Sequence, residues 1–335
     1  MRPRIVVSCG DANGIGIECL FGALRGAMTP EALRSSPLPA DFALCIDAEL
    51  LSAVVRAHNL DASAVEALGI ELIPVNATAV VQPGVCAADA GAVAIASLNV
   101  AVDRVLSGKA DGILTLPISK DACKKAGWPY PGHTEMLAER AHGEALMLLC
   151  FQDVRVGLVT AHVPLRYVAD KLTSARIEER ILAMHNALQR DFGIQSPRIA
   201  VLGLNPHAGE EGLIGKEEQT IIAPAIAASI GASIGASIGA SIDVVGPFPA
   251  DGFFAFGAYK AFDGILAMYH DQGLIPLKLL AQGGGVNVTA NLNIVRTSPD
   301  HGTAFDIAGR NAADASSTAS AIAMVLDIVR ARASV

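Results

Sequence analysis

The sequence predicts an α/β fold divided into two domains. Short apolar runs that are typical of strands alternate with longer segments whose apolar residues recur every three or four positions. This alternation indicates βαβ crossovers and a largely parallel sheet in each domain. Hydrophobic residues make up 52% of the chain but aromatic residues only 4%, so the core is built from Ala, Val, Ile and Leu, which suits layered α/β packing. At 335 residues the chain exceeds the size at which one core keeps growing, and two domains are expected.

The first half of the chain predicts a regular strand-helix order. The apolar runs predict strands at residues 5–8, 42–46, 71–74 and 112–116. Between them, three- and four-residue apolar spacing predicts helices at residues 17–27, 48–58 and 88–107.

The same order resumes in the second half. Strands are predicted at residues 146–150, 155–160, 198–202 and 264–268, and helices at 134–141, 174–192, 216–228 and 313–333. Residues 274–277 also have a strand-like apolar pattern.

Residues 229–242 repeat Ser-Ile-Gly-Ala. Since each Gly costs about 1 kcal/mol in a helix, a frayed helix and a loop are equally compatible with this repeat. We interpret this repeat as a surface connection without a catalytic role.

Composition argues against several classes of partner. The formal net charge is −8 and Lys and Arg form no cluster, which excludes a nucleic-acid surface. The N-terminus lacks an export signal, and no stretch is convincing as a membrane span. Six cysteines without C-x-x-C spacing lie in apolar segments, which indicates buried free thiols in a reducing cytoplasm.

Histidines suggest a metal site. His162, His207 and His270 each follow an apolar run that ends in a small-residue turn. Open α/β sheets bind ligands at the carboxyl ends of their strands, and three imidazoles with an open position suit a divalent ion acting as a Lewis acid. Their spacing is unlike that of a zinc finger, so each taken alone is better explained as a hydrogen-bonded structural histidine, and only the shared setting favours a metal site. His58, His142 and His185 are expected on helix surfaces, whereas His301 belongs to a later loop.

Other polar strings suggest anion binding. Residues 10–16 (Gly-Asp-Ala-Asn-Gly-Ile-Gly) fit neither nucleotide fingerprint, and both a plain βα turn and a ligand contact stay open. His133 and Thr134 precede a helical pattern, where Thr134 either caps the helix or helps to bind an anion.

Lys278, Asn287 and Arg296 follow His270 through apolar surroundings, where an anionic substrate group would satisfy the cations. Residues 299–310 are either a long connection or a backbone that closely approaches adenine or ribose.

Three strings together carry a family resemblance: Gly-His-Thr-Glu at 132–135, Asn-Pro-His-Ala-Gly-Glu at 205–210 and Ala-Met-Tyr-His-Asp-Gln-Gly at 267–273. In this combination and order the chain resembles the 4-hydroxythreonine-4-phosphate dehydrogenase family of pyridoxine biosynthesis, within the isocitrate/isopropylmalate dehydrogenase-like superfamily. The resemblance extends from Gly10 to about Gly309, although residues 10–18 lack the Pro residues of many relatives. It implies two α/β/α domains with an active-site cleft between them. We expect one domain at 1–132 plus 291–335, and a central domain with dimer contacts at 133–290.

The resemblance also implies residue roles. His162, His207 and His270 would bind one divalent ion across a homodimer interface. The implied substrate contacts are His133, Thr134, Lys278, Asn287 and Arg296. The implied NAD-binding residues are His301, Gly302, Thr303, Ala304 and Asp306. The catalytic candidates are Asp251, Asp271 and Lys278, and the sequence does not identify the base among them.

The implied reaction is NAD-dependent oxidation of 4-phosphooxy-L-threonine to a β-keto acid, which decarboxylates to 3-amino-2-oxopropyl phosphate. A divalent ion would lower the pKa of the substrate hydroxyl and polarise the keto oxygen. NADP is an alternative to NAD. Three imidazoles favour Zn, while Mg, Co and Mn stay open. The alternatives are oxidation of another phosphorylated hydroxy acid, D-threonate or D-erythronate 4-phosphate, a metal-dependent hydrolase, and a non-catalytic metal-binding module.

Overall fold

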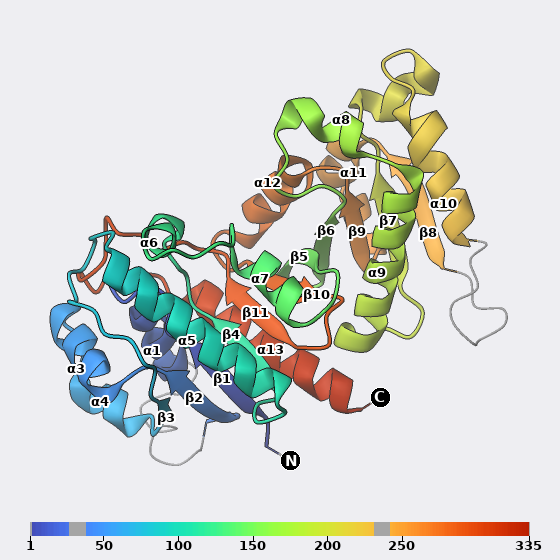
Figure 1. Cartoon of the computed structure of the whole chain (residues 1–335). Coiled ribbons are helices and arrows are strands. Elements are labelled where there is room, and N and C mark those ends of the chain that lie inside the picture. The colour runs from blue at the N-terminus through green and yellow to red at the C-terminus, as the bar shows by residue number, and fades with distance from the viewer. Residues whose placement is uncertain (1, 27–37, 231–241, 335) are drawn as a thin grey trace. The chain divides into compact units, whose positions relative to one another are not determined.

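A computed structural model describes residues 2–26, 38–230 and 242–334 of the chain (Figure 1). Most of the Ser-Ile-Gly-Ala repeat, at residues 231–241, lies outside this part. The chain forms two compact units. Unit 1 comprises Met1–Gly143, Gly283–Asn287 and Leu292–Arg330, and unit 2 comprises Glu144–Gln282, Val288–Asn291 and Ala331–Val335. Unit 1 thus continues eleven residues past the expected domain boundary after residue 132, since 143 − 132 = 11.

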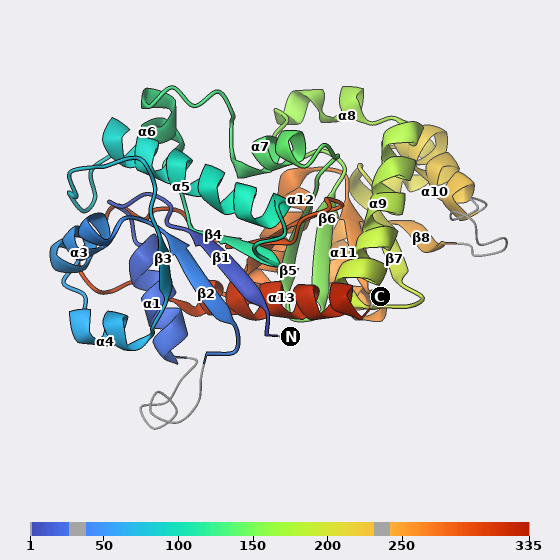
Figure 2. The ribbon, with the colours of Figure 1, turned by 60° about the horizontal axis from the view of Figure 1, so that its bottom comes forward.

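Unit 1 contains a parallel sheet with the strand order β3-β2-β1-β4-β11. These strands are β1 (Arg4–Ser8), β2 (Asp41–Cys45), β3 (Glu71–Ile73), β4 (Gly112–Thr115) and β11 (Arg296–Pro299). The helices are α1 (Gly16–Gly26), α3 (Ala48–Ala57), α4 (Ala62–Ala67), α5 (Ala88–Leu106), α6 (Lys120–Lys125), α7 (His133–Arg140) and α13 (Ser316–Ala333). Figure 2 shows α5 and α13 on opposite sides of these strands. Both sheet faces are therefore covered, and β1 and β4 are almost wholly buried.

Unit 2 contains a second strand order, β5-β6-β9-β7-β8. These strands are β5 (Leu146–Phe151), β6 (Val154–Leu158), β7 (Arg198–Leu202), β8 (Asp243–Phe248) and β9 (Gly264–Ala267). The β5–β6 pair is an antiparallel hairpin, and the other pairs are parallel. The helices are α8 (Val168–Lys171), α9 (Ser174–Phe192), α10 (Ala223–Ile230), α11 (Ala250–Ala255) and α12 (His270–Ala281). Strand β10 (Val286–Ala290) has residues in both units.

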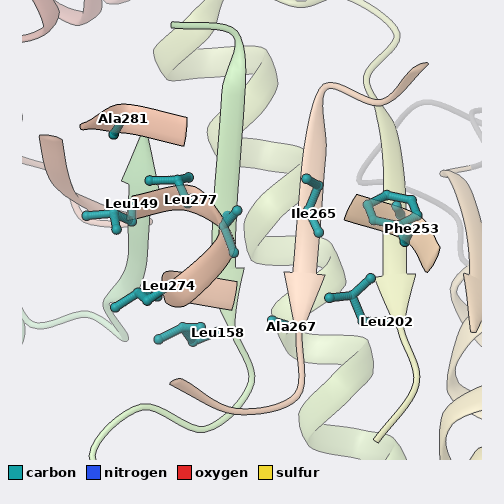
Figure 3. Packing of buried hydrophobic residues seen from close by; sticks show 11 residues of the cluster. Leu149, Leu158, Leu202, Phe253, Ile265, Ala267, Leu274, Leu277 and Ala281 are labelled. Atoms are coloured by element: carbon teal, nitrogen blue, oxygen red, sulfur yellow. The ribbon is translucent and has the colours of Figure 1, made fainter. Parts of the chain in front are cut away.

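A buried hydrophobic cluster joins α12 to the sheet of unit 2 (Figure 3). Leu274 and Leu277 of α12 lie in one cluster with strand residues such as Leu158 and Ile265. Because α12 begins at His270, this packing fixes where the start of that helix lies relative to the strand ends.

Most predicted elements are confirmed, but the strand-like interpretation of residues 274–277 is wrong. Those residues lie inside α12. Leu274 and Leu277 are buried while Ile275 and Lys278 are exposed, so the apolar positions follow a helical period rather than an alternating one. The helix predicted at 216–228 begins instead as the short π-helix η3 (Glu218–Ile222) and continues as the α-helix α10.

Two histidines that were expected on helix surfaces are buried. His58 follows α3, and its Nε2 lies 3.0 Å from the carbonyl oxygen of Ala12. His185 lies on the buried face of α9, and neither ring nitrogen has a hydrogen-bond partner in the described part of the chain. Burial lowers the pKa of both imidazoles. The prediction of an exposed position is confirmed for His142.

The loop at residues 10–16 is a buried βα turn. Its backbone N–H groups are used internally: Asp11 donates to Pro117 O, Gly14 to Asp11 O and Ile15 to Thr303 O. Gly14 packs so closely on Thr303 that a Cβ would lie 2.9 Å from the carbonyl oxygen. These contacts favour the structural interpretation, because few N–H groups are left to bind an anion.

The prediction of free cysteines is confirmed, and five of the six are buried while Cys86 is half-buried. Across the residues that the structure describes, no helix has the length and apolar character needed to cross a bilayer.

Candidate functional site

The three predicted metal-binding histidines follow three adjacent parallel strands of unit 2. Strand β9 lies between β6 and β7, and its Leu266 pairs with Gly157 on one side and Val201 on the other. His162, His207 and His270 follow the carboxyl ends of β6, β7 and β9 respectively. The prediction that these residues follow strand ends is therefore confirmed.

His162 and His270 lie side by side. Their ring centroids are 6.0 Å apart, with an angle of 40° between the ring planes. A hydrogen bond from Thr160 Oγ1 to Met268 O (2.7 Å) continues the pairing past the ends of β6 and β9. The two imidazoles are thus placed by the sheet and not by a flexible loop alone.

A carboxylate orients the His270 ring. Nδ1 of His270 lies 2.7 Å from Oδ1 of Asp271. Because an ionised carboxylate only accepts, this contact favours the proton on Nδ1 and leaves the Nε2 lone pair available as a metal ligand. Asp271 therefore has an orienting contact with a predicted ligand.

His207 shares a pocket with two predicted catalytic residues. The pocket has a volume of about 470 Å³ and lies wholly within unit 2. Its polar lining includes His207, Asp251 and Asp271, together with Asn205 and Gln272. Asp271 thus connects this pocket to the His162–His270 pair through its contact with His270.

Within the part of the chain that the structure describes, no three-ligand metal site is complete. Among the described residues, no three His, Cys, Asp or Glu side chains are grouped closely enough to hold an ion. Two imidazoles on one tetrahedral ion have ring centroids roughly 5 Å apart when each nitrogen lies about 2.1 Å from the metal, so the 6.0 Å separation of His162 and His270 is about 1 Å longer than in a formed pair. Convergence of all three histidines is not met within one chain, and convergence across two copies stays a prediction.

Gln272 links two strand ends at this site, and the sequence interpretation missed it. Its side chain accepts a hydrogen bond from Met268 N (2.7 Å) and donates one to Gly203 O (2.5 Å). It therefore joins the ends of β9 and β7, the strands that precede His270 and His207. An amide is suited to this position because it is both donor and acceptor.

Lys278 lies on the exposed side of α12. The expectation that it lies in apolar surroundings after a strand is wrong. The argument from the cost of a buried cation therefore applies to Arg296 and not to Lys278.

His133 begins a second group of predicted residues, in unit 1. It is the first residue of α7, and Gly132 is the N-cap residue. Thr134 is therefore not the N-cap, and the capping interpretation of Thr134 is wrong. His133 Nε2 is buried without a hydrogen-bond partner among the described residues. Burial, and then the charges of Arg296 and Lys120, lower the pKa of His133 well below its usual value, so the ring is neutral at pH 7.

Arg296 is a buried cation beside this helix. It opens β11, is 3% exposed, and donates to Thr115 Oγ1 from Nε (3.0 Å) and Nη2 (2.7 Å). Burial lowers its pKa to about 10, while the charge of Glu135 opposes this shift. The guanidinium therefore stays charged at pH 7 and is held in one orientation.

Lys120 adds a second cation that the sequence interpretation did not single out. It begins α6, and its Nζ would lie 3.9 Å from a Cβ added at Gly132. The signal in the sequence was weak, because an exposed Lys at the start of a short helix is common. Asn287 of β10 belongs to the same unit, and its buried Oδ1 lacks a partner within the described chain.

The predicted cofactor residues form an irregular loop in unit 1. His301 Nε2 lies 3.2 Å from Thr318 Oγ1, which ties the loop to α13. Gly302 and Asp306 are exposed, and a Cβ at Gly302 would meet no described atom within 4 Å. An accessible carboxylate beside open backbone fits the hydroxyls of a ribose, so these residues are compatible with a nucleotide.

Comparison with known proteins gives consistent results. Residues 39–325 match the family described as "Pyridoxal phosphate biosynthetic protein PdxA". A protein named 4-hydroxythreonine-4-phosphate dehydrogenase from Bacteroides thetaiotaomicron is 40% identical to this chain, and the match covers 99% of this chain and 90% of the relative. A protein of the same name from Geobacter metallireducens is also 40% identical, and the match covers 99% of this chain and 97% of the relative. A crystal structure of the Klebsiella pneumoniae protein of that name has a TM-score of 0.81 and 36% identity, covering 98% of this chain and all of that one. A terephthalate 1,2-cis-dihydrodiol dehydrogenase from Burkholderia xenovorans has a TM-score of 0.63 and 27% identity, covering 96% and 97%.

Proposed function

Because the chain belongs to the PdxA family of pyridoxal phosphate biosynthetic proteins, we propose that it is an oxidoreductase that converts 4-phosphooxy-L-threonine to a β-keto acid, which loses carbon dioxide to give 3-amino-2-oxopropyl phosphate. The observation that carries this proposal is the grouping at the strand ends of unit 2. The His162–His270 pair, the contact of His270 with Asp271, and the pocket that Asp271 shares with His207 and Asp251 form one connected set.

His162, His207 and His270 would hold one divalent ion, with zinc, magnesium, cobalt and manganese as candidates. The loop at 301–306 would hold the adenosine part of NAD or of NADP. When bound, the ion supplies Lewis-acid chemistry and the dinucleotide accepts the hydride. Asp271 keeps the His270 ring in the tautomer that can bind. Oxidation also requires a base for the hydroxyl proton. Since Asp271 is engaged with His270, Asp251 and Lys278 are the better candidates.

The basic group of unit 1 would bind the anionic parts of the substrate. His133 offers a buried ring nitrogen at the start of α7, where backbone N–H groups and the helix dipole favour an anion. Arg296 supplies an oriented guanidinium, and Lys120 is an additional cation beside Gly132. Thr134 and Asn287 supply neutral polar groups, and Lys278 of unit 2 remains a proposed contact.

A second copy of this chain would complete the metal site. One chain lacks a three-ligand group within its described residues. The helix α12, which begins at His270, exposes Ile275 (57%) and Leu279 (72%) further along, and Phe256 after α11 is 90% exposed. Apolar side chains of this size are commonly covered in a protein interface. Replacing Leu279 with Glu should convert a dimer to monomers in light scattering.

Free thiols fit a reducing compartment, so we place the enzyme in the cytoplasm. The main alternative is a related phosphorylated hydroxy acid as substrate, D-threonate or D-erythronate 4-phosphate. A solved structure of similar fold is named for a terephthalate dihydrodiol, so this fold is not restricted to one substrate. Comparing kcat/KM on the three phosphorylated acids distinguishes these possibilities.

The test is NADH formation from 4-phosphooxy-L-threonine by the purified protein with an added divalent ion. His207→Ala should lower kcat/KM by at least about 100-fold, because a ligand is lost. The control is His142→Asn, an exposed histidine in a left-handed turn that Asn tolerates. Full turnover by His207→Ala without added metal would contradict the mechanism.

A further inference from the structure

The loop that carries His207 has an unusual backbone. Five consecutive residues of η2 (Pro206–Gly212), from His207 to Glu211, have φ between 42° and 81°. Four of them have side chains, for which a left-handed run is unfavourable. Such a turn persists only where its surroundings hold it.

The carboxylate of Glu218 binds the entry to this turn. Oε1 accepts hydrogen bonds from the backbone N–H groups of Leu204 and Asn205, each at 2.7 Å. Oε2 accepts one from Asn205 Nδ2 at 2.9 Å. Glu218 is only 3% exposed, so three donors replace the water that a carboxylate would otherwise bind.

The same carboxylate also lies against the interior of the turn. A Cβ added at Gly209, whose φ is +81°, would lie 2.6 Å from Glu218 Oε2. A Cβ added at Gly203, at the end of β7, would lie 3.1 Å from Glu218 Oε1. The turn therefore wraps around Glu218, and the two glycines make room for its oxygens.

We propose that Glu218 is a positioning residue for His207, which acts by holding the left-handed turn in the conformation that presents the imidazole. This inference rests on the proposed function, in which His207 is a metal ligand. Glu218 does not line the pocket of His207, Asp251 and Asp271, so it acts through the backbone.

The chain offers a matched control. Glu217 is the neighbouring carboxylate and also accepts from Asn205 Nδ2, at 2.8 Å, but the backbone N–H groups of Leu204 and Asn205 donate to Glu218. The comparison is therefore between Glu218→Gln and Glu217→Gln, with Glu218→Ala as the more severe variant. Gln keeps the size of the side chain and places a donor against Asn205 Nδ2 or against the two N–H groups.

The first measurement is amide hydrogen exchange by mass spectrometry on the full chain, without added metal. Exchange in peptides covering residues 203–213 should accelerate at least about tenfold in Glu218→Gln, because a neutral amide either binds the Leu204 and Asn205 N–H groups more weakly than the carboxylate or turns its own NH2 group against them. The second measurement is Co²⁺ titration followed by visible absorption. The Co²⁺ Kd should rise about 10- to 100-fold in Glu218→Gln and change less than about threefold in Glu217→Gln.

Each result is decisive. Unchanged exchange in 203–213 overturns the proposal, as does faster exchange with an unaltered Co²⁺ Kd. Equal effects of the two Gln variants overturn it too, since Glu217 lacks the backbone contacts. If the wild-type chain binds no Co²⁺, the positioning proposal is overturned together with the metal of the proposed function. If Co²⁺ binds normally but no substrate is oxidised, the proposed function fails and the role of Glu218 is still tested.

Discussion

Replacing Thr115 with Val tests the interaction that orients Arg296. Thr115 is fully buried and its hydroxyl oxygen accepts two hydrogen bonds from the guanidinium, at 3.0 and 2.7 Å. Val has nearly the same shape but no acceptor. A hydrogen bond to a charged group contributes about 1.5–3 kcal/mol, and the two bonds share one oxygen, so we expect a loss of about 3 kcal/mol in the free energy of unfolding. This equals a roughly 150-fold change in the unfolding equilibrium constant.

The assay is urea denaturation of Thr115→Val, with Thr115→Ser as the control. Ser keeps the acceptor and removes one methyl group, which costs about 1 kcal/mol. The urea midpoint should therefore fall clearly further for Val than for Ser, by about 0.7 M for a slope of about 3 kcal/mol per M. If Val is as stable as the wild type, or more stable than Ser, the hydroxyl does not hold Arg296 as described.

Three further predictions concern other buried or charged groups. His185→Leu should stabilise the fold and make its free energy of unfolding depend less on acid pH. Because burial lowers the pKa of His185, the folded wild type is not destabilised by this group above pH 6.5 and loses stability as the pH falls below that value. Urea midpoints of both proteins at pH 7.5 and about 5.5 would detect the difference. Gln272→Glu should raise the Co²⁺ Kd about tenfold or more, because a carboxylate cannot donate to Gly203 O; an unchanged Kd would show that this bond does not position the histidines. Lys120→Ala should raise KM for the phosphorylated substrate about 10-fold with little change in kcat, and a fall in kcat alone would contradict a binding role beside His133.

The fold was predictable because its determinants are local. Strand β4 is buried at every position, and α5 has apolar residues at helical spacing, so both are visible as patterns in the chain. Residues 274–277 were the exception. A four-residue apolar run has too little length to separate a strand from a buried helix face, and only the packing of Leu274 and Leu277 identified α12.

The histidine positions were predictable to the level of the strand end and no further. A polar string after an apolar run indicates the carboxyl end of a strand, which is why His162, His207 and His270 were selected together. The order of strands in the sheet is a property of nonlocal pairing. The adjacency of β6, β9 and β7, and with it the 6.0 Å separation of two imidazoles, is therefore seen only in the folded chain.

What the sequence determined by itself was the class of fold, the family resemblance and the residue types that are suited to binding metal and anion, since these depend on composition, periodicity and short motifs. Only the tertiary structure decided which polar groups are buried and what they contact. Glu218 and Gln272 are ordinary polar residues in the sequence, yet each binds backbone groups at a strand end. His185 was expected on a helix surface but is buried. Burial and hydrogen bonding depend on neighbours that are distant along the chain, and no local pattern records those neighbours.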